Sequence, residues 1–158
     1  MLMSNPNAER SRRWFEEVWN QRQSEVIDEL LTPESVGHTE TGDLRGIDEF
    51  KRFQADVLSA FPDLCLAIEA IVADGDDVVI RWRASGCHSG DGLGVRATQQ
   101  PVSFVRMTWH RYQDGKLMEG WNFWNHPVMV QQLRDADRRP GQLATSPGDV
   151  VSLGDPDR

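Results

Sequence analysis

The spacing of the apolar residues changes once along the chain, close to Pro62. Before this point, apolar residues recur every three or four positions, which is typical of amphipathic helices. After it, they alternate with polar residues, which is typical of β-strands that bury one face. Helices followed by antiparallel strands indicate an α+β fold, in which the helices pack on one face of a curved sheet.

The first part of the chain is expected to contain three helices. Asn5 and Ser24 are typical helix-capping residues, and Pro33 and Pro62 end the segments that precede them. A short extended segment is expected at residues 34–38. The apolar spacing places the helices at residues 6–20, 25–31 and 46–61.

The second part is expected to form two β-hairpins. A three-residue loop in the first hairpin would set Ile68 opposite Ile80 and keep one face apolar. The same turn chemistry in the second hairpin would set Asn122 opposite Arg106, whereas a two-residue loop would set Asn122 opposite Met107. We expect the three-residue loop in both hairpins. The alternation places the strands at residues 64–72, 78–84, 102–112 and 116–124.

Composition excludes several classes of partner. A formal net charge of -8, from 25 acidic and 17 basic side chains, would repel nucleic acid. No apolar run approaches the roughly 20 residues of a membrane span, and no signal peptide is recognisable. Cys65 and Cys87 match neither a metal-ligand spacing nor a disulfide framework. We therefore expect a cytoplasmic protein that binds neither nucleic acid nor membranes.

The two faces of the second hairpin differ in composition. One combines a guanidinium, a hydroxyl, an imidazole and an amide with aromatic walls, which is typical of a small-molecule pocket. It consists of Phe104, Arg106, Thr108, His110, Met118, Gly120, Asn122 and Trp124. The other face is strongly apolar and consists of Val105, Met107, Trp109, Trp121 and Phe123. Composition alone does not decide which of the two faces lies inside.

The order of the motifs resembles a known family. After the first helix come P-x-x-V-x-H, G-x-x-x-F, F-P-D-L, G-x-H-x-G, D-G-K and W-x-x-W. This order resembles the SnoaL-like polyketide cyclases, which belong to the nuclear-transport-factor-2-like superfamily of cone-shaped α+β domains. The resemblance covers about residues 7–133 and implies a single SnoaL-like domain over residues 1–133. A short last helix is expected at 126–133, followed by a polar and mobile tail at 134–158.

The resemblance also implies a chemistry, namely the aldol-type ring closure of a small polyketide-like compound without metal or cofactor. In such proteins the aspartate that follows the tryptophan of the last strand transfers the proton. The corresponding residue here is Asn122, whose amide cannot act as a base near neutral pH. Arg106 and Asn122 would then polarise a carbonyl, and His38, His88 or His110 would move the proton. The resemblance thus makes the polar face of the second hairpin the pocket.

These considerations give two sets of candidate residues. The catalytic candidates are Arg106, Asn122, His88 and His38. The ligand-binding candidates are Thr108, His110, Phe104, Trp82, Trp124 and Trp14. Each histidine is more commonly a hydrogen-bonded structural residue, and Arg106 can equally be buried in a pair with Glu119 or with a glutamate early in the chain.

Two further expectations follow. Loss of the aspartate also fits a non-catalytic carrier or sensor, or an accessory protein of the hydroxylase type. The apolar face would then lie outside, where so much aromatic surface would be unstable in a monomer. We therefore expect a homodimer through Val105, Met107, Trp109, Trp121 and Phe123.

Overall fold

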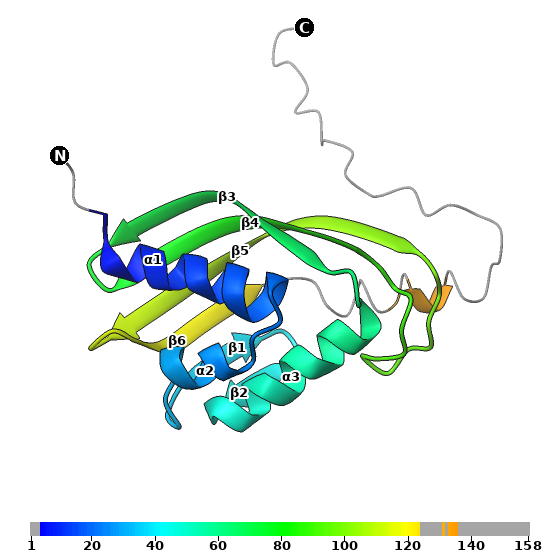
Figure 1. The fold of residues 1–158 in the computed structure, drawn as a ribbon, viewed down its shortest axis with the longest axis horizontal. Coiled ribbons are helices and arrows are strands. Elements are labelled where there is room, and N and C mark those ends of the chain that lie inside the picture. Colours follow the sequence, from blue (N-terminus) through cyan, green and yellow to red (C-terminus); the bar gives the residue numbers. More distant parts are fainter. Residues whose placement is uncertain (1–3, 124–130, 132, 136–158) are drawn as a thin grey trace, which may run out of the picture.

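The computed structural model describes residues 4–123, 131 and 133–135. The described chain forms helices and one mixed sheet (Figure 1). The helical segments are α1 Pro6–Arg13, the π-helix η1 Trp14–Asn20, α2 Glu25–Leu30 and α3 Gly46–Ala60. The strands are β1 Val36–Thr39, β2 Gly42–Arg45, β3 Cys65–Asp74, β4 Asp77–Cys87, β5 Pro101–Gln113 and β6 Lys116–Phe123.

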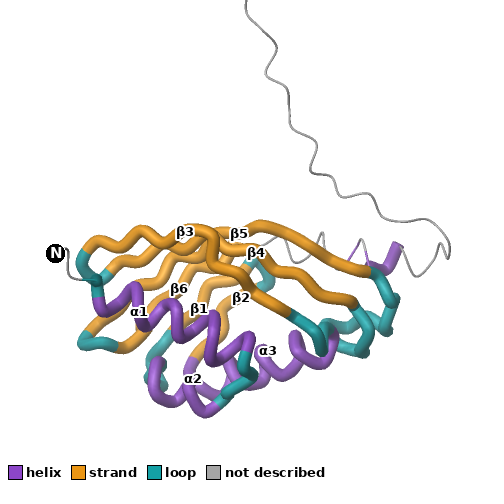
Figure 2. Tube along the Cα trace, turned by 45° about the horizontal axis from the view of Figure 1, so that its top comes forward, coloured by secondary structure: helices purple, strands orange, loops and turns teal. Residues whose placement is uncertain are grey.

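The sheet has the strand order β2-β1-β6-β5-β4-β3. β1 runs parallel to β6, and all other neighbouring strands are antiparallel. The sheet curves, and the helices gather on one side of it (Figure 2). This arrangement confirms the α+β fold predicted from the change in apolar spacing, with the helices covering the concave side.

The predicted helices form with small differences. The Asn5 side chain accepts a hydrogen bond from the Asn7 backbone nitrogen at 2.8 Å, so the first cap is confirmed. Ser24 is the N-cap residue of α2 as predicted, but its side chain makes no capping hydrogen bond. The first helix widens into η1, where the wider turn lets two adjacent pairs of residues face inward. These buried residues are Trp14, Phe15, Val18 and Trp19.

The predicted register of the first hairpin is wrong. Asp74 pairs with Asp77, which leaves a two-residue loop, and Ile68 lies opposite Trp82 instead of Ile80. A bulge at Glu69 adds one residue to β3 and shifts the pairing. In the part of β3 that follows the bulge, Ile71 therefore points inward and Val72 points outward. β4 keeps the predicted inward face of Val78, Ile80, Trp82 and Ala84.

The second hairpin differs from its prediction for the same reason. Asp114 and Gly115 both have positive φ, 51° and 75°, which matches the two-residue hairpin turn of type I′. The ladder then shifts by one residue at Met118. Asn122 consequently lies opposite Thr108 and not opposite Arg106. The polar and apolar faces of β5 nevertheless divide as expected, because alternation along a strand does not depend on register.

The edge of the sheet beside β6 was only partly predicted. The extended segment at 34–38 corresponds to β1, whereas β2 was not predicted. The Phe50 ring packs directly on Gly37, where a Cβ atom would lie 2.5 Å from the ring. This contact seats α3 against β1.

The last predicted segments lie mostly outside the described residues. Leu133 is buried in the core, but most of the predicted helix at 126–133, its cap Asn125 and the tail at 136–158 are not described. None of the helices in the described part of the chain is long and apolar enough to span a membrane.

Candidate functional site

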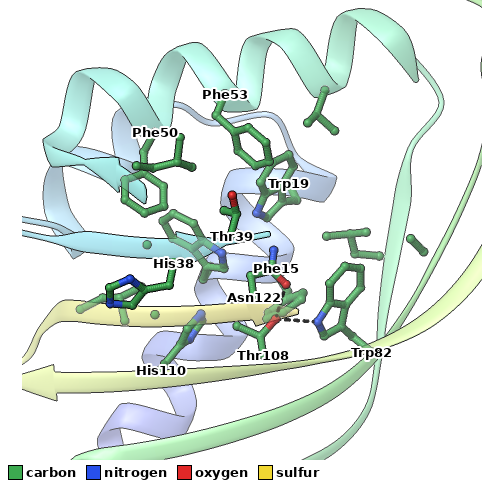
Figure 3. Close-up of a pocket in the computed structure, with 18 of the residues that line it drawn as sticks. Phe15, Trp19, His38, Thr39, Phe50, Phe53, Trp82, Thr108, His110 and Asn122 are labelled. Carbon is green, nitrogen blue, oxygen red and sulfur yellow. Dashed lines mark hydrogen bonds between the residues drawn. The ribbon is translucent and has the colours of Figure 1, made fainter. Parts of the chain in front are cut away.

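A cavity lies between the concave side of the sheet and the helices. It encloses about 980 Å³ of space, its open mouth included. Aromatic side chains from both layers form much of its wall (Figure 3). Trp14 packs edge-on against Phe50 with ring centres 5.8 Å apart, and Phe15 packs against Trp82 at 5.5 Å. Such a wall suits a flat apolar ligand.

A directed chain of hydrogen bonds crosses the sheet beside the cavity. The Trp82 indole nitrogen donates to the Thr108 hydroxyl at 2.8 Å, and Thr108 donates to the Asn122 side-chain oxygen at 3.0 Å (Figure 3). An indole nitrogen can only donate, so the Thr108 oxygen accepts and its hydrogen is left for Asn122. The Asn122 amide nitrogen has no partner among the described residues. Asn122 therefore offers donors to a ligand.

His110 forms a second polar point on the same wall. His110 pairs with Gly120 on β6, and Asn122 follows Gly120 by two residues. The side chains of His110 and Asn122 therefore project from the same face of the sheet. The His110 Nδ1 lies 3.0 Å from the Ser11 hydroxyl, which lies 2.8 Å from the Tyr112 hydroxyl. Burial lowers the pKa of His110 to about 3, so its ring is neutral at physiological pH. A neutral ring of this kind cannot take up a proton there.

Other polar groups of the lining are either donors or already engaged. The indole nitrogens of Trp14 and Trp19 have no partner among the described residues. The hydroxyls of Ser35 and Thr39 both donate at 2.6 Å to backbone oxygens, of Leu117 and Gly42 respectively. No Asp, Glu, Lys or Arg is found among the described lining residues.

His38 contributes to the lining, but its ring lies on the outer face of the sheet. It stacks on Trp121, the residue beside it on β6, with ring centres 5.5 Å apart. Nδ1 lies 2.8 Å from the Asp43 carboxylate and Nε2 lies 2.7 Å from the Glu119 carboxylate. Hydrogen bonds to these two carboxylates raise the pKa of His38, and the bond to Glu119 has the larger effect. Neither nitrogen is left to exchange a proton with a ligand in the cavity.

His88 is fully buried but does not line the cavity. Its Nδ1 accepts from the Thr98 backbone nitrogen at 3.2 Å and lies 3.0 Å from the Thr98 hydroxyl. Its ring packs on Phe61, which does line the cavity, with ring centres 5.2 Å apart. Burial lowers the pKa of His88, and its Nε2 has no partner among the described residues.

Arg106 is on the pocket side of β5 but is not among the residues that line the cavity. It pairs with Trp82 on β4, its guanidinium lies over the Phe104 ring at 5.1 Å, and its Nη1 donates to the Val105 carbonyl at 2.7 Å. Its Nε is buried with no partner in the described chain. The expected pair with Glu119 does not form, since Glu119 contacts His38 and Arg111. Contrary to the expectation, Arg106 and Asn122 therefore do not line the same cavity.

The other candidates lie where predicted, as far as they are described. The cavity is lined by Trp14, Trp82, Phe104, Thr108, His110 and Asn122. Trp124 and the Phe123 side chain lie outside the described residues. In the part of the chain that is described, no group of three or more His, Cys, Asp or Glu side chains is placed to hold a metal ion.

Comparison with known proteins identifies the family. The model of the SnoaL-like polyketide cyclases matches residues 9–133. The chain belongs to the SnoaL-like polyketide cyclase family. A search among curated proteins gave no match.

Solved structures of SnoaL-like proteins share the fold. A proposed SnoaL-like polyketide cyclase from Jannaschia sp. CCS1 is 26% identical, with 84% of this chain and 96% of that chain covered and a TM-score of 0.76. A proposed polyketide cyclase from Acidithiobacillus ferrooxidans is 27% identical over 86% and 99%, with a TM-score of 0.71. AclR from Streptomyces galilaeus, a proposed hydroxylase, is 30% identical over 81% and 82%, with a TM-score of 0.67. These matches confirm the cone-shaped fold.

Two residues of this SnoaL-like site were not predicted. Ser11 lies on the buried side of α1 and Tyr112 lies in phase with Thr108 and His110 on β5. The signal for Tyr112 was present in the strand alternation. The signal for Ser11 was a hydroxyl within an apolar helical stripe, but its partner on β5 is 99 residues away and depends on the tertiary fold.

Proposed function

We propose that this SnoaL-like protein binds a flat, oxygenated, polyketide-like compound and promotes its intramolecular aldol-type ring closure. The observation that carries the proposal is the polarity of the cavity. The unpaired side-chain groups of Asn122, Trp14 and Trp19 in the described lining are hydrogen-bond donors within an aromatic wall. Such a cavity favours a ligand whose polar groups are acceptors, as carbonyl oxygens are.

The Asn122 amide is placed to stabilise negative charge on a carbonyl oxygen. When a carbon next to the carbonyl loses a proton to water, the charge collects on that oxygen as an enolate. A donor held in place by Thr108 needs no reorganisation to meet this charge, and it acts more strongly in an apolar cavity than in water. The enolate carbon then bonds to a second carbonyl carbon, and the new alkoxide takes a proton from water. The product is an isomer of the substrate, and the reaction consumes no cofactor.

A second candidate function is binding without turnover, as in a carrier or an accessory protein for oxidation. The lack of Asp, Glu, Lys and Arg in the described lining favours it, because no side-chain base with an ordinary pKa is at hand. The similarity to AclR, a proposed hydroxylase, points the same way. Catalysis and binding make different predictions for substitutions at Asn122.

Paired variants of Asn122 test the proposal. Ring closure of a linear poly-β-ketone can be followed by chromatography and mass spectrometry. Asn122→Leu removes the donor and is expected to lower the rate by about 10²-fold or more, as removal of an oxyanion donor does elsewhere. Asn122→Asp supplies a carboxylate that Thr108 can still hold, and it is expected to accelerate ring closure. If the wild-type protein and the Asp variant bind the ketone but neither converts it, the binding function stands instead.

We also propose that the protein is a homodimer. The apolar face of β5 and β6 leaves Met107 56% exposed and Trp109 42% exposed. Trp109 packs against Trp121 with ring centres 5.3 Å apart, and Arg111 covers both rings from one end. A second copy of the same face would remove this aromatic surface from water.

A further inference from the structure

We infer that Tyr112 and Ser11 are positioning residues that hold His110 as the neutral ring with its hydrogen on Nε2. His110 is then a second hydrogen-bond donor beside Asn122. Together, His110 and Asn122 determine which ligands the cavity accepts. The inference deepens the proposed function and rests on it for the identity of the ligand class. The hydrogen positions themselves follow from the buried contacts alone.

Tyr112, Ser11 and His110 form a chain of hydrogen bonds, and the hydroxyl hydrogen of Tyr112 sets its direction. The Tyr112 side chain is almost fully buried, and burial raises its pKa to about 12, so the hydroxyl keeps its hydrogen. Its described partner is the Ser11 oxygen at 2.8 Å. If Tyr112 donates there, the Ser11 hydrogen is free for His110 Nδ1 at 3.0 Å. The ring hydrogen of a neutral His110 must then be on Nε2.

The reverse direction leaves one more buried polar group unsatisfied, the Tyr112 hydroxyl hydrogen. If His110 carried its hydrogen on Nδ1, it would donate to Ser11, and Ser11 would donate to Tyr112. The Tyr112 hydrogen would then have no acceptor among the described residues, whereas Nε2 lacks a described protein partner in either direction. Unsatisfied buried groups are costly, so the first direction is favoured.

The charged form of His110 is excluded by its surroundings. Trp14, Phe15 and Tyr112 pack around the ring with centres 6.1 to 6.3 Å away. No carboxylate contacts the ring within the described chain. An imidazolium without a counter-charge would be strongly destabilised there.

The consequence concerns ligand selection. Two donors on neighbouring positions of one wall can share a carbonyl oxygen or bind two of them. A ligand with an N–H or O–H at the same place would set donor against donor and leave buried hydrogens unpaired. Of two ligands with the same shape, the cavity is therefore expected to bind the one that accepts a hydrogen bond at this place more tightly than the one that donates.

Nitrogen NMR of the ligand-free protein tests the tautomer directly. Protein labelled with ¹⁵N-histidine at pH 7 is expected to show Nε2 of His110 protonated and Nδ1 unprotonated, with the signals assigned by their loss in His110→Gln. Tyr112→Phe keeps the ring but removes the hydrogen that directs Ser11, and Ser11→Ala removes the partner of Nδ1. Both variants are expected to show a mixture of tautomers. A wild-type His110 that carries its hydrogen on Nδ1, or that is charged at pH 7, would overturn the inference even if neither variant folds.

Matched ligands test the selection. 1-Indanone and indole have similar bicyclic shapes, but the first presents a carbonyl acceptor and the second an N–H donor. Equilibrium dialysis is expected to show at least about tenfold tighter binding of 1-indanone by the wild-type protein, because an unsatisfied buried donor is costly. Tyr112→Phe is expected to reduce this ratio at least about threefold. Equal binding of the two compounds by the wild-type protein would overturn the selection.

The two experiments separate this inference from the proposed function. A protonated Nε2 with a clear preference for 1-indanone, but without ring closure of any poly-β-ketone, supports the inference and refutes the catalytic proposal. Ring closure together with an Nδ1–H tautomer supports the proposed function and overturns the inference.

Discussion

Thr108 on β5 lies directly opposite Asn122 on β6 and donates its hydroxyl hydrogen to the Asn122 side-chain oxygen over 3.0 Å. The sense of this bond follows from Trp82, whose indole nitrogen donates to the same hydroxyl. Asn122 therefore offers its amide nitrogen to a ligand. The position that resembles the aspartate of acid/base cyclases thus carries a fixed donor in this protein.

Replacing Thr108 with Val tests this relay. Valine has the same shape, but it leaves the Trp82 nitrogen and the Asn122 oxygen without their partner. Each such buried group costs about 1–3 kcal/mol, so the free energy of unfolding is expected to fall by about 2–6 kcal/mol. Urea denaturation followed by tryptophan fluorescence measures the change.

Thr108→Ser is the matched control for that substitution. It keeps the hydroxyl and removes one methyl group, so a loss of about 1 kcal/mol is expected. If the Val variant is as stable as the Ser variant, the hydroxyl does not join the two side chains in solution.

Local signals in the sequence were enough to predict the order of elements. The cap at Asn5 and the stop at Pro62 act within a few residues of their helix ends. Alternation along β5 correctly placed Thr108 and His110 on one face, because a strand alternates whatever its neighbour does.

The pairing between strands could not be predicted in the same way. The bulges at Glu69 and Met118 each insert one residue, and whether a bulge is tolerated depends on packing across the whole sheet. In the second hairpin, the two-residue turn and the bulge each shift the pairing by one residue, and together they replaced Arg106 by Thr108 as the neighbour of Asn122. His38 was misplaced for a related reason, since its side of the sheet follows from the parallel pairing of β1 with β6.

Arg106→Met is expected to leave the site intact. The Nε of Arg106 is buried without a partner in the described chain, and the guanidinium lies over Phe104. Methionine keeps an unbranched chain against this ring and removes the unpaired group. The free energy of unfolding is expected to stay the same or rise by up to about 1 kcal/mol, and 1-indanone affinity to change less than twofold. Loss of 1-indanone binding in this variant would indicate that Arg106 contacts the ligand.

The stability supplied by His38 is expected to depend on pH. Its folded-state pKa lies above the ordinary value of 6.5, so its contribution is complete below pH 6.5 and is lost as the pH rises through the raised pKa. Asp43 has the opposite sign, because its pKa lies below the ordinary 3.8 and its contribution is lost as the pH falls through the lowered value. The pair therefore stabilises the fold most between about pH 4 and 6.5.

Urea denaturation of wild-type protein and His38→Phe across pH 4 to 9 measures this dependence. Phenylalanine keeps the stacking on Trp121 but cannot pair with Asp43 or Glu119. The difference in unfolding free energy is expected to be largest near pH 5 and to shrink above pH 7, where imidazole has one hydrogen for two carboxylates. A difference that is constant with pH would contradict the two ion pairs.

Sedimentation tests the dimer and its interface together. The wild-type protein is expected to sediment at twice the 18.0 kDa chain mass at micromolar concentration. Met107→Glu would bring the same carboxylate from both subunits into the apolar face, so the dimer is expected to weaken at least about tenfold. Val72→Glu is the matched control, because Val72 is 70% exposed on β3, two strands away from β5. It is expected to leave the dimer intact. A wild-type protein that sediments only as a monomer refutes the interface, and so does equal dissociation of the two glutamate variants.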